Sequence, residues 1–120
     1  MKKLGICAVG IGILMSSIPS ASAAISVSTV AKLTVSKSGT SWSAAGLNTT
    51  TFTEGQYDAL LMVQVYQKGK YMVDRKDTFQ KSPANLGKTA TTSDGTNDIT
   101  CYAFAAVNGK TDDDTKVHTF

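Results

Sequence analysis

The sequence predicts an all-β protein: a small antiparallel β-sandwich, immunoglobulin-like or fibronectin-III-like, with about seven or eight strands. Ser and Thr are abundant after residue 23, and Thr and the β-branched aliphatic residues favour pleated, half-buried surfaces. Apolar and polar residues alternate in several segments, and turn signals recur between those segments at short intervals. The Cys-Trp-Cys arrangement of true immunoglobulin domains is absent, so a jelly roll or a small closed barrel remains an alternative.

The first 23 residues have the order of a Sec-type signal peptide. A basic start at residues 1–3 precedes an apolar run at residues 4–15, and residues 21–23 form an A-x-A cleavage site. The apolar run is 12 residues long, whereas a membrane-spanning helix needs about 20. We therefore expect the leader, residues 1–23, to be removed. Residues 24–120 are expected to be a single secreted domain with no integral membrane span.

The first part of this domain predicts short strands separated by a turn. Period-two alternation in residues 25–36 indicates a strand with one apolar face, and residues 37–39 form the turn that ends it. Residues 40–46 carry the single tryptophan, Trp42. Residues 47–53 are interpreted as a further, separate short strand.

Residues 57–67 are the strongest predicted strand. Apolar side chains occupy both of its faces, which is typical of a strand in the middle of a sheet. Lys68-Gly69 is a tight hairpin signal, and residues 70–79 are expected to return antiparallel to this strand. The charged residues 74–77 of the return strand indicate a solvated sheet margin.

Residues 98–107 are the second strong strand, after a polar strand at residues 86–92. One face carries apolar residues without a polar interruption, and we assign it to the core: Ile99, Cys101, Ala103, Ala105 and Val107. Asn108-Gly109 is expected to begin a loop that continues through the acidic residues 112–114. Residues 115–120 alternate again and are predicted to form the last strand.

The charge balance argues against polyanionic partners. Without the two lysines of the leader, ten basic residues stand against nine acidic ones, and the net charge is near +1. The domain has no basic stripe of the kind that nucleic acids or anionic membranes require. We therefore expect no nucleic-acid partner.

The sequence gives little support for catalysis or for a metal site. The single histidine, His118, lies at the end of the sequence, and the single glutamate, Glu54, has no aspartate at a fixed spacing. One Cys and one His cannot complete a zinc site. The oxygen-rich loops at residues 94–98 and 112–114 are expected at opposite ends of one strand, too far apart to hold calcium together. We expect no enzymatic activity, no cofactor and no metal.

The best functional indication is a surface. Opposite the predicted core face, the two strong strands carry large side chains that would form one aromatic-rich patch if the strands are neighbours: Leu60, Met62, Tyr66, Tyr102 and Phe104. Such patches can mark a binding site for a partner, and aromatic rings also serve as platforms on which sugars stack. The alternative is that another sheet covers this patch, which would make it the core and place the Cys101 face outside.

Cys101 is the single cysteine of residues 24–120, because Cys7 lies in the leader. A disulfide within the domain is therefore impossible. Cys101 is either a buried apolar residue, which its position on the predicted core face favours, or a thiol that pairs with another molecule.

Three non-enzymatic functions follow, and we rank first an extracellular binding module for a protein or a cell-surface glycan. The second is a structural subunit of a surface or matrix assembly, joined through Cys101 or through edge strands. The third is a secreted bacteriocin-like or toxin-like protein, which lacks the support of a cationic amphipathic helix. The leader and the strand pattern resemble those of small exported β-sandwich proteins of Gram-positive bacteria, without a motif that is diagnostic of one family.

Overall fold

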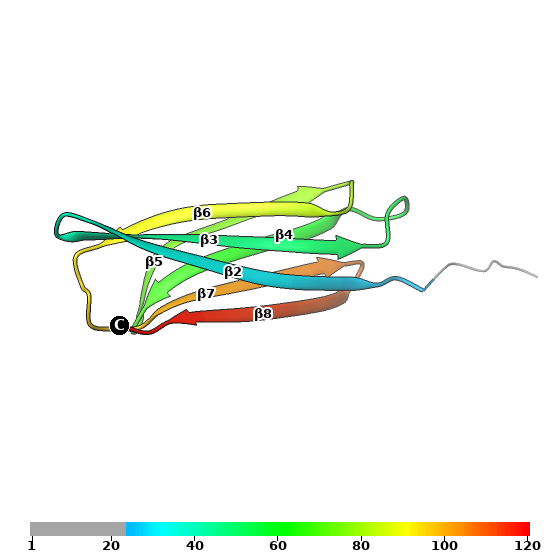
Figure 1. The fold of residues 1–120 in the computed structure, drawn as a ribbon. Helices are drawn as coiled ribbons and strands as arrows, with labels where there is room; N and C mark the ends of the chain where they lie inside the picture. The colour runs from blue at the N-terminus through cyan, green and yellow to red at the C-terminus, as the bar shows by residue number, and fades with distance from the viewer. Residues whose placement is uncertain (1–23) are drawn as a thin grey trace, which may run out of the picture.

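The computed structural model describes residues 24–120, and the predicted signal peptide, residues 1–23, lies outside the described residues. The described part contains seven strands (Figure 1). In chain order they are β2 (Val27–Ser38), β3 (Ser41–Phe52), β4 (Ala59–Gln67), β5 (Lys70–Phe79), β6 (Ala84–Thr92), β7 (Ile99–Val107) and β8 (Lys110–His118). The prediction of an all-β protein with about seven or eight strands is confirmed.

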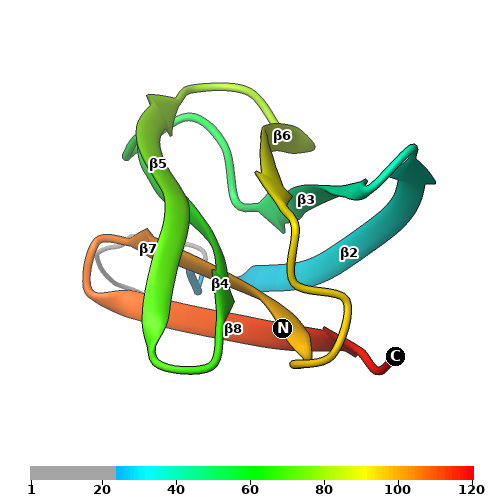
Figure 2. The ribbon, with the colours of Figure 1, turned by 90° about the vertical axis from the view of Figure 1, so that its left-hand side faces the viewer.

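The strands form two antiparallel sheets that face each other. The smaller sheet has the order β2-β3-β6, and the larger sheet has the order β5-β4-β7-β8. The pairs β3–β6 and β4–β7 join strands that are not consecutive, so the chain crosses between the layers as in Greek-key sandwiches. The end-on view of Figure 2 shows the two layers. This is the small β-sandwich that the sequence predicts.

Alternate residues of the two central strands, β4 and β7, build the core. In each strand every second side chain is fully buried and the side chains between them are half-buried. The buried set of β7 is the predicted one: Ile99, Cys101, Ala103, Ala105 and Val107. Across the sandwich it faces apolar side chains of the smaller sheet, among them Phe52 and Leu86. The alternative in which this face lies outside is therefore wrong.

Two tight turns connect the hairpins of the larger sheet. Lys68 and Gly69 have φ values of 27° and 77°, and Asn108 and Gly109 have φ values of 47° and 82°. Positive φ at both central residues suits a two-residue hairpin, because the backbone of such a turn twists in the same sense as the strands that it connects. The first hairpin was predicted. The second corrects the expected loop: β8 begins directly after Gly109, so the acidic residues 112–114 lie inside a strand.

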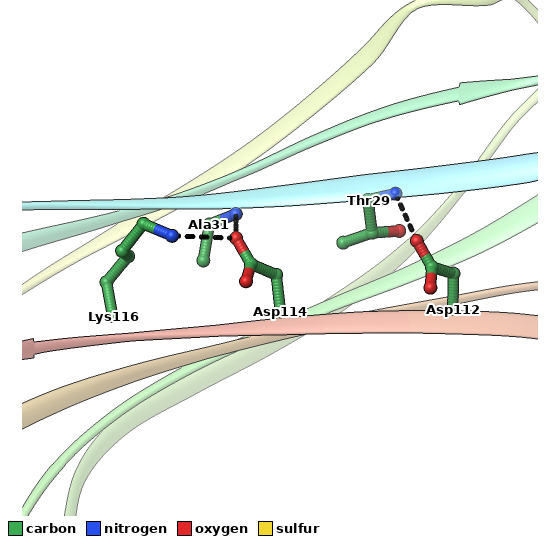
Figure 3. A network of polar contacts seen from close by, with 5 residues as sticks. All are labelled: Thr29, Ala31, Asp112, Asp114 and Lys116. Atoms are coloured by element: carbon green, nitrogen blue, oxygen red, sulfur yellow. Dashed lines mark hydrogen bonds and ion pairs between the residues drawn. The ribbon is translucent and has the colours of Figure 1, made fainter.

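Two carboxylates of β8 hold the first strand of the opposite sheet, an arrangement that we call the carboxylate clamp (Figure 3). Asp112 accepts a hydrogen bond from the backbone N–H of Thr29 at 2.7 Å, and Asp114 accepts one from the N–H of Ala31 at 2.8 Å. The ammonium of Lys116 lies 3.2 Å from the same oxygen of Asp114. Since the residue numbers rise together on both strands, β2 and β8 run parallel to each other. We call such a line, where the edge strands of the two sheets meet, a seam.

The opposite seam, between β5 and β6, has a side-chain bridge of its own. The guanidinium of Arg75 donates a hydrogen bond to the backbone carbonyl of Gly87 at 3.2 Å. Both edges of the smaller sheet thus have backbone groups that are occupied by side chains of the larger sheet. Occupied edge groups are less able to pair with a strand from another molecule.

A buried amide joins the two sheets in the middle of the sandwich. The side chain of Asn48, on β3, has an exposed fraction of 0%. Its amide nitrogen donates hydrogen bonds to the backbone carbonyls of Met62 and Phe104, at 2.9 and 3.0 Å, and its amide oxygen accepts one from the hydroxyl of Thr50. The Thr50 hydroxyl also lies 3.0 Å from that of Thr29. Both polar atoms of the buried Asn48 side chain therefore have hydrogen-bond partners, as burial requires.

β3 is one long strand and not the two separate segments that were predicted for residues 40–46 and 47–53. Gly46, the last residue of the first of these segments, lies in the middle of β3 and on its core-facing side. A Cβ atom at Gly46 would lie 2.6 Å from a methyl group of Val65 and 3.0 Å from the sulfur of Cys101. The glycine therefore allows the two sheets to approach closely, which is a known role of glycine inside strands.

We expect Gly46→Ala to lower the free energy of unfolding by about 1–3 kcal/mol, because the added methyl group overpacks the core. Urea unfolding followed by circular dichroism measures the change. Gly87→Ala is the matched control, since its Cβ would meet its nearest atom at 3.4 Å, an ordinary contact. Equal stability of the two variants would contradict this expectation, because it would mean that Val65 and Cys101 can shift to accommodate the added methyl group.

Candidate functional site

The five residues of the predicted patch lie together on the outer face of the larger sheet, the face turned away from β2, β3 and β6. The two strands that carry them are direct neighbours: Met62 is opposite Phe104, and Gln64 is opposite Tyr102. All five side chains are half-buried by their neighbours in the sheet. They are Leu60, Met62 and Tyr66 of β4, and Tyr102 and Phe104 of β7. No other part of residues 24–120 forms a sheet over this face.

One end of the outer face is hollowed, and we call this region the tyrosine hollow. Its volume is about 470 Å³, and its lining residues are Gln64, Tyr66, Gly69, Lys70, Tyr71 and Tyr102. The rings of Tyr66 and Tyr71 meet edge to face, with centroids 6.1 Å apart and planes at 72°. Tyr71 retains 71% of its exposure, so most of this aromatic side chain is available to a ligand.

Tyr71 is not among the predicted patch residues, although the turn sequence is enough to place it on this face. Strict alternation from the far end of the hairpin places Tyr71 on the other face. A bulge between Val65 and Tyr66 shifts the register, so that Tyr66 pairs with Tyr71. Counting outward from the two-residue turn at Lys68-Gly69 gives the same pairing directly. Bulges re-aim side chains in this way.

The tyrosine hollow combines neutral polar groups with charges of both signs. The hydroxyl of Tyr102 donates a hydrogen bond to the carboxylate of Asp113 at 3.0 Å. Partial burial, and then this bonded carboxylate, raise the pKa of Tyr102, so its phenol stays neutral at physiological pH. Lys70 lines the hollow and is positively charged, whereas two carboxylates lie beside it: Asp113, bonded to Tyr102, and Asp74, opposite Gln64 in the register.

Cys101 is fully buried, under Gly46 of the opposite sheet. Burial raises the pKa of its thiol, which keeps the sulfur protonated and unreactive. The folded domain therefore does not present Cys101 as the intermolecular thiol that the sequence left open. A disulfide with another molecule would require the sandwich to open.

The remaining candidates for chemistry are not brought together. His118 is opposite Ile99 in the register, whereas Cys101 is opposite Lys116, and the ring of His118 contacts Phe120. The carboxylate of Glu54 accepts a hydrogen bond from the backbone N–H of Ser82. Within residues 24–120 there is no group of three or more His, Cys, Asp or Glu side chains placed to hold a metal ion.

The turn at residues 94–98 is held by its own aspartate. The carboxylate of Asp94 accepts hydrogen bonds from the hydroxyl and N–H of Thr96 and from the side-chain amide of Asn97. These bonds hold the pKa of Asp94 well below its usual range. The oxygens that were weighed as calcium ligands thus serve to shape the turn.

Comparison with known proteins bears on the fold alone. No family model matches the chain, and no curated protein matches it. Among solved structures, the chain is similar to part of a Bacteroides fragilis protein that is named as a candidate β-galactosidase, with a TM-score of 0.55 and 12% identity. The match covers 75% of this chain and 16% of that protein. The similarity therefore supports a β-sandwich domain and carries no activity across.

No helix within residues 24–120 is long and apolar enough to cross a membrane.

Proposed function

We propose that this protein is a secreted, non-enzymatic binding module that binds an extracellular partner through the outer face of its larger sheet. The observation that supports this proposal is the exposed patch of aromatic and apolar side chains on two adjacent strands, with the tyrosine hollow at one end. Contiguous apolar patches on a protein surface often mark sites that bind a partner or a ligand.

The seams of the sandwich favour this proposal over a structural subunit joined by strand pairing. The carboxylate clamp and Arg75 occupy backbone groups at both edges of the smaller sheet. In the larger sheet, the edge strands β5 and β8 carry charged side chains, which also discourage pairing between molecules. With Cys101 buried, the second route to assembly, a disulfide between protomers, has no surface thiol in this domain.

The binding proposal is tested by a polar substitution on the outer face. Met62→Gln removes apolar surface from the patch, whereas Leu47→Gln makes the same kind of change on the outer face of the smaller sheet. We expect Met62→Gln to weaken retention on a cell-wall polysaccharide preparation or on an extracellular protein fraction by about tenfold. Leu47→Gln should leave retention unchanged, and equal behaviour of the two variants would refute the assigned face.

Export and the state of Cys101 are tested by the intact mass of the protein that its host secretes. We expect the mass of residues 24–120, unchanged by a reducing agent. A mass that halves on reduction would instead support an assembly linked through Cys101.

A further inference from the structure

We propose that the tyrosine hollow holds a neutral pyranose unit of a saccharide, with the sugar ring stacked on Tyr71. This inference rests on the proposed function and specifies the ligand of the same face. The volume of about 470 Å³ falls within the range of about 300–1,000 Å³ that is typical of small-molecule sites. Three features of the hollow favour such a ligand: its aromatic wall, its neutral polar groups and the charges around it.

The aromatic wall suits the C–H face of a sugar ring. The π face of an aromatic ring carries partial negative charge and attracts the weakly positive hydrogens of C–H groups. Tyr66 and Tyr71 meet at 72°, so they form a corner and not a closed stack. Because Tyr71 is 71% exposed, a ligand ring can lie against it without displacing another side chain.

The polar groups suit hydroxyls, each of which both donates and accepts hydrogen bonds. Gln64 lines the hollow with an amide that has two donors and an acceptor. The hydroxyl of Tyr102 donates to Asp113, which leaves its oxygen free to accept a bond from a ligand hydroxyl. The hollow therefore offers donors and acceptors side by side, close to an aromatic surface.

The charges favour a neutral ligand. Lys70 lines the hollow, and Asp74 lies opposite Gln64 in the register of β4 and β5. The Asp113 carboxylate that bonds Tyr102 is a second acidic neighbour. The hollow therefore has no cluster of cations to bind an acidic ligand, and Lys70 disfavours a basic one.

The apolar part of the outer face is also narrow. In register, Met62 and Phe104 are flanked by Lys76 on β5 and by Asp113 on β8. A stable protein–protein interface needs about 800 Å² on each partner, with a core depleted of charged residues. A strip only two residues wide between charges suits a saccharide chain better than a protein.

The test is calorimetric titration of the protein with neutral hexasaccharides of glucose, mannose, galactose and xylose. We expect at least one of them to bind. Tyr71→Ala should weaken that binding by about tenfold, and Tyr71→Phe, which keeps the ring, should stay within about threefold of the unchanged protein. Tyr57→Ala is the matched control, because Tyr57 is also exposed, at 44%, and lies outside the hollow.

The possible results separate this inference from the proposed function. Binding of none of the four sugars, or equal affinity of Tyr71→Ala and Tyr57→Ala, would overturn the saccharide site. Tighter, salt-sensitive binding of polygalacturonate would overturn the neutrality of the ligand. If the hexasaccharides fail while retention on an extracellular protein fraction still depends on Met62, the binding module stands with a protein partner. If neither property depends on this face, both proposals fail.

Discussion

Asn48→Asp is expected to lower the free energy of unfolding by about 3–5 kcal/mol near neutral pH, the usual cost of an uncompensated buried charge. The substitution barely changes the shape of the side chain. It replaces an amide nitrogen that donates to the carbonyls of Met62 and Phe104 with a carboxylate oxygen that faces the same two carbonyls. Two hydrogen bonds become two repulsive contacts in a site with an exposed fraction of 0%.

The effect of this substitution should depend on pH in a definite direction. Burial raises the pKa of the introduced carboxyl in the folded state above the unfolded value of about 3.9. The folded variant therefore holds a proton that the unfolded chain has lost, and its stability falls as the pH rises through this interval. Urea unfolding at pH 4.5 and pH 7 should show the smaller loss at pH 4.5.

The control for this prediction is Asn85→Asp, the same chemical change at an exposed residue of β6. We expect its stability to stay within about 0.5 kcal/mol of the unchanged protein. A loss at Asn48→Asp below about 1 kcal/mol, or one that does not diminish at pH 4.5, would contradict the assigned link between the sheets.

The double substitution Asp112→Ala/Asp114→Ala is expected to cost about 2–3 kcal/mol. Hydrogen bonds to charged groups contribute about 1.5–3 kcal/mol each, a figure that solvent reduces here because both carboxylates are partly exposed. The change leaves the N–H groups of Thr29 and Ala31 without the acceptors that hold β2 to β8. Thermal and urea unfolding measure it.

Asp113→Ala is the control, because it removes one carboxylate from the same strand, against the two that the double substitution removes. Asp113 lies on the outer face and bonds Tyr102 instead of β2, so we expect a much smaller loss of stability. If all three aspartates contributed equally, net charge and not the clamp would explain the result.

The clamp should also make the protein sensitive to acid. The N–H of Ala31, and then Lys116, hold the pKa of Asp114 below its usual range. A carboxyl with a lowered folded pKa contributes stability that is present above the unfolded pKa and is lost as the pH falls toward the folded pKa. We expect the urea concentration at the midpoint of unfolding to decrease once the pH is below about 4. In Asp114→Asn this decrease should be less steep. Identical pH profiles would contradict this role of Asp114.

The sequence predicted the fold class and the central strands because their signals are local and strong. In residues 57–67 and 98–107 one face of the strand is apolar over most of its length, and burial in β4 and β7 follows this period of two residue by residue. Composition misled the prediction where a long-range contact decides the structure. Aspartate is uncommon in strands, yet Asp112 and Asp114 lie in β8 because β2, more than eighty residues earlier in the chain, supplies hydrogen-bond donors to both.

In the candidate site, too, the residues predicted correctly are those that follow from the period of a single strand. The face shared by Leu60, Met62 and Tyr66 follows from the period of one strand, and the pairing with β7 had to be assumed. Tyr71 needed the register of a bulged hairpin, and Gly46 needed knowledge of which side chains lie across the sandwich. The alternation of a strand can be recognised from its own residues. The partners of a residue across a sheet, or in the opposite sheet, depend on how the whole chain folds.

The carboxylate clamp also determines how the domain would respond to mechanical force. β2 and β8 run parallel along their seam, so the start of β2 and the end of β8 lie at opposite ends of the sandwich (Figure 1). Tension applied between these two ends slides one strand along the other. The bonds from Asp112 and Asp114 then carry the load at the same time and resist in shear, instead of being unzipped one after the other.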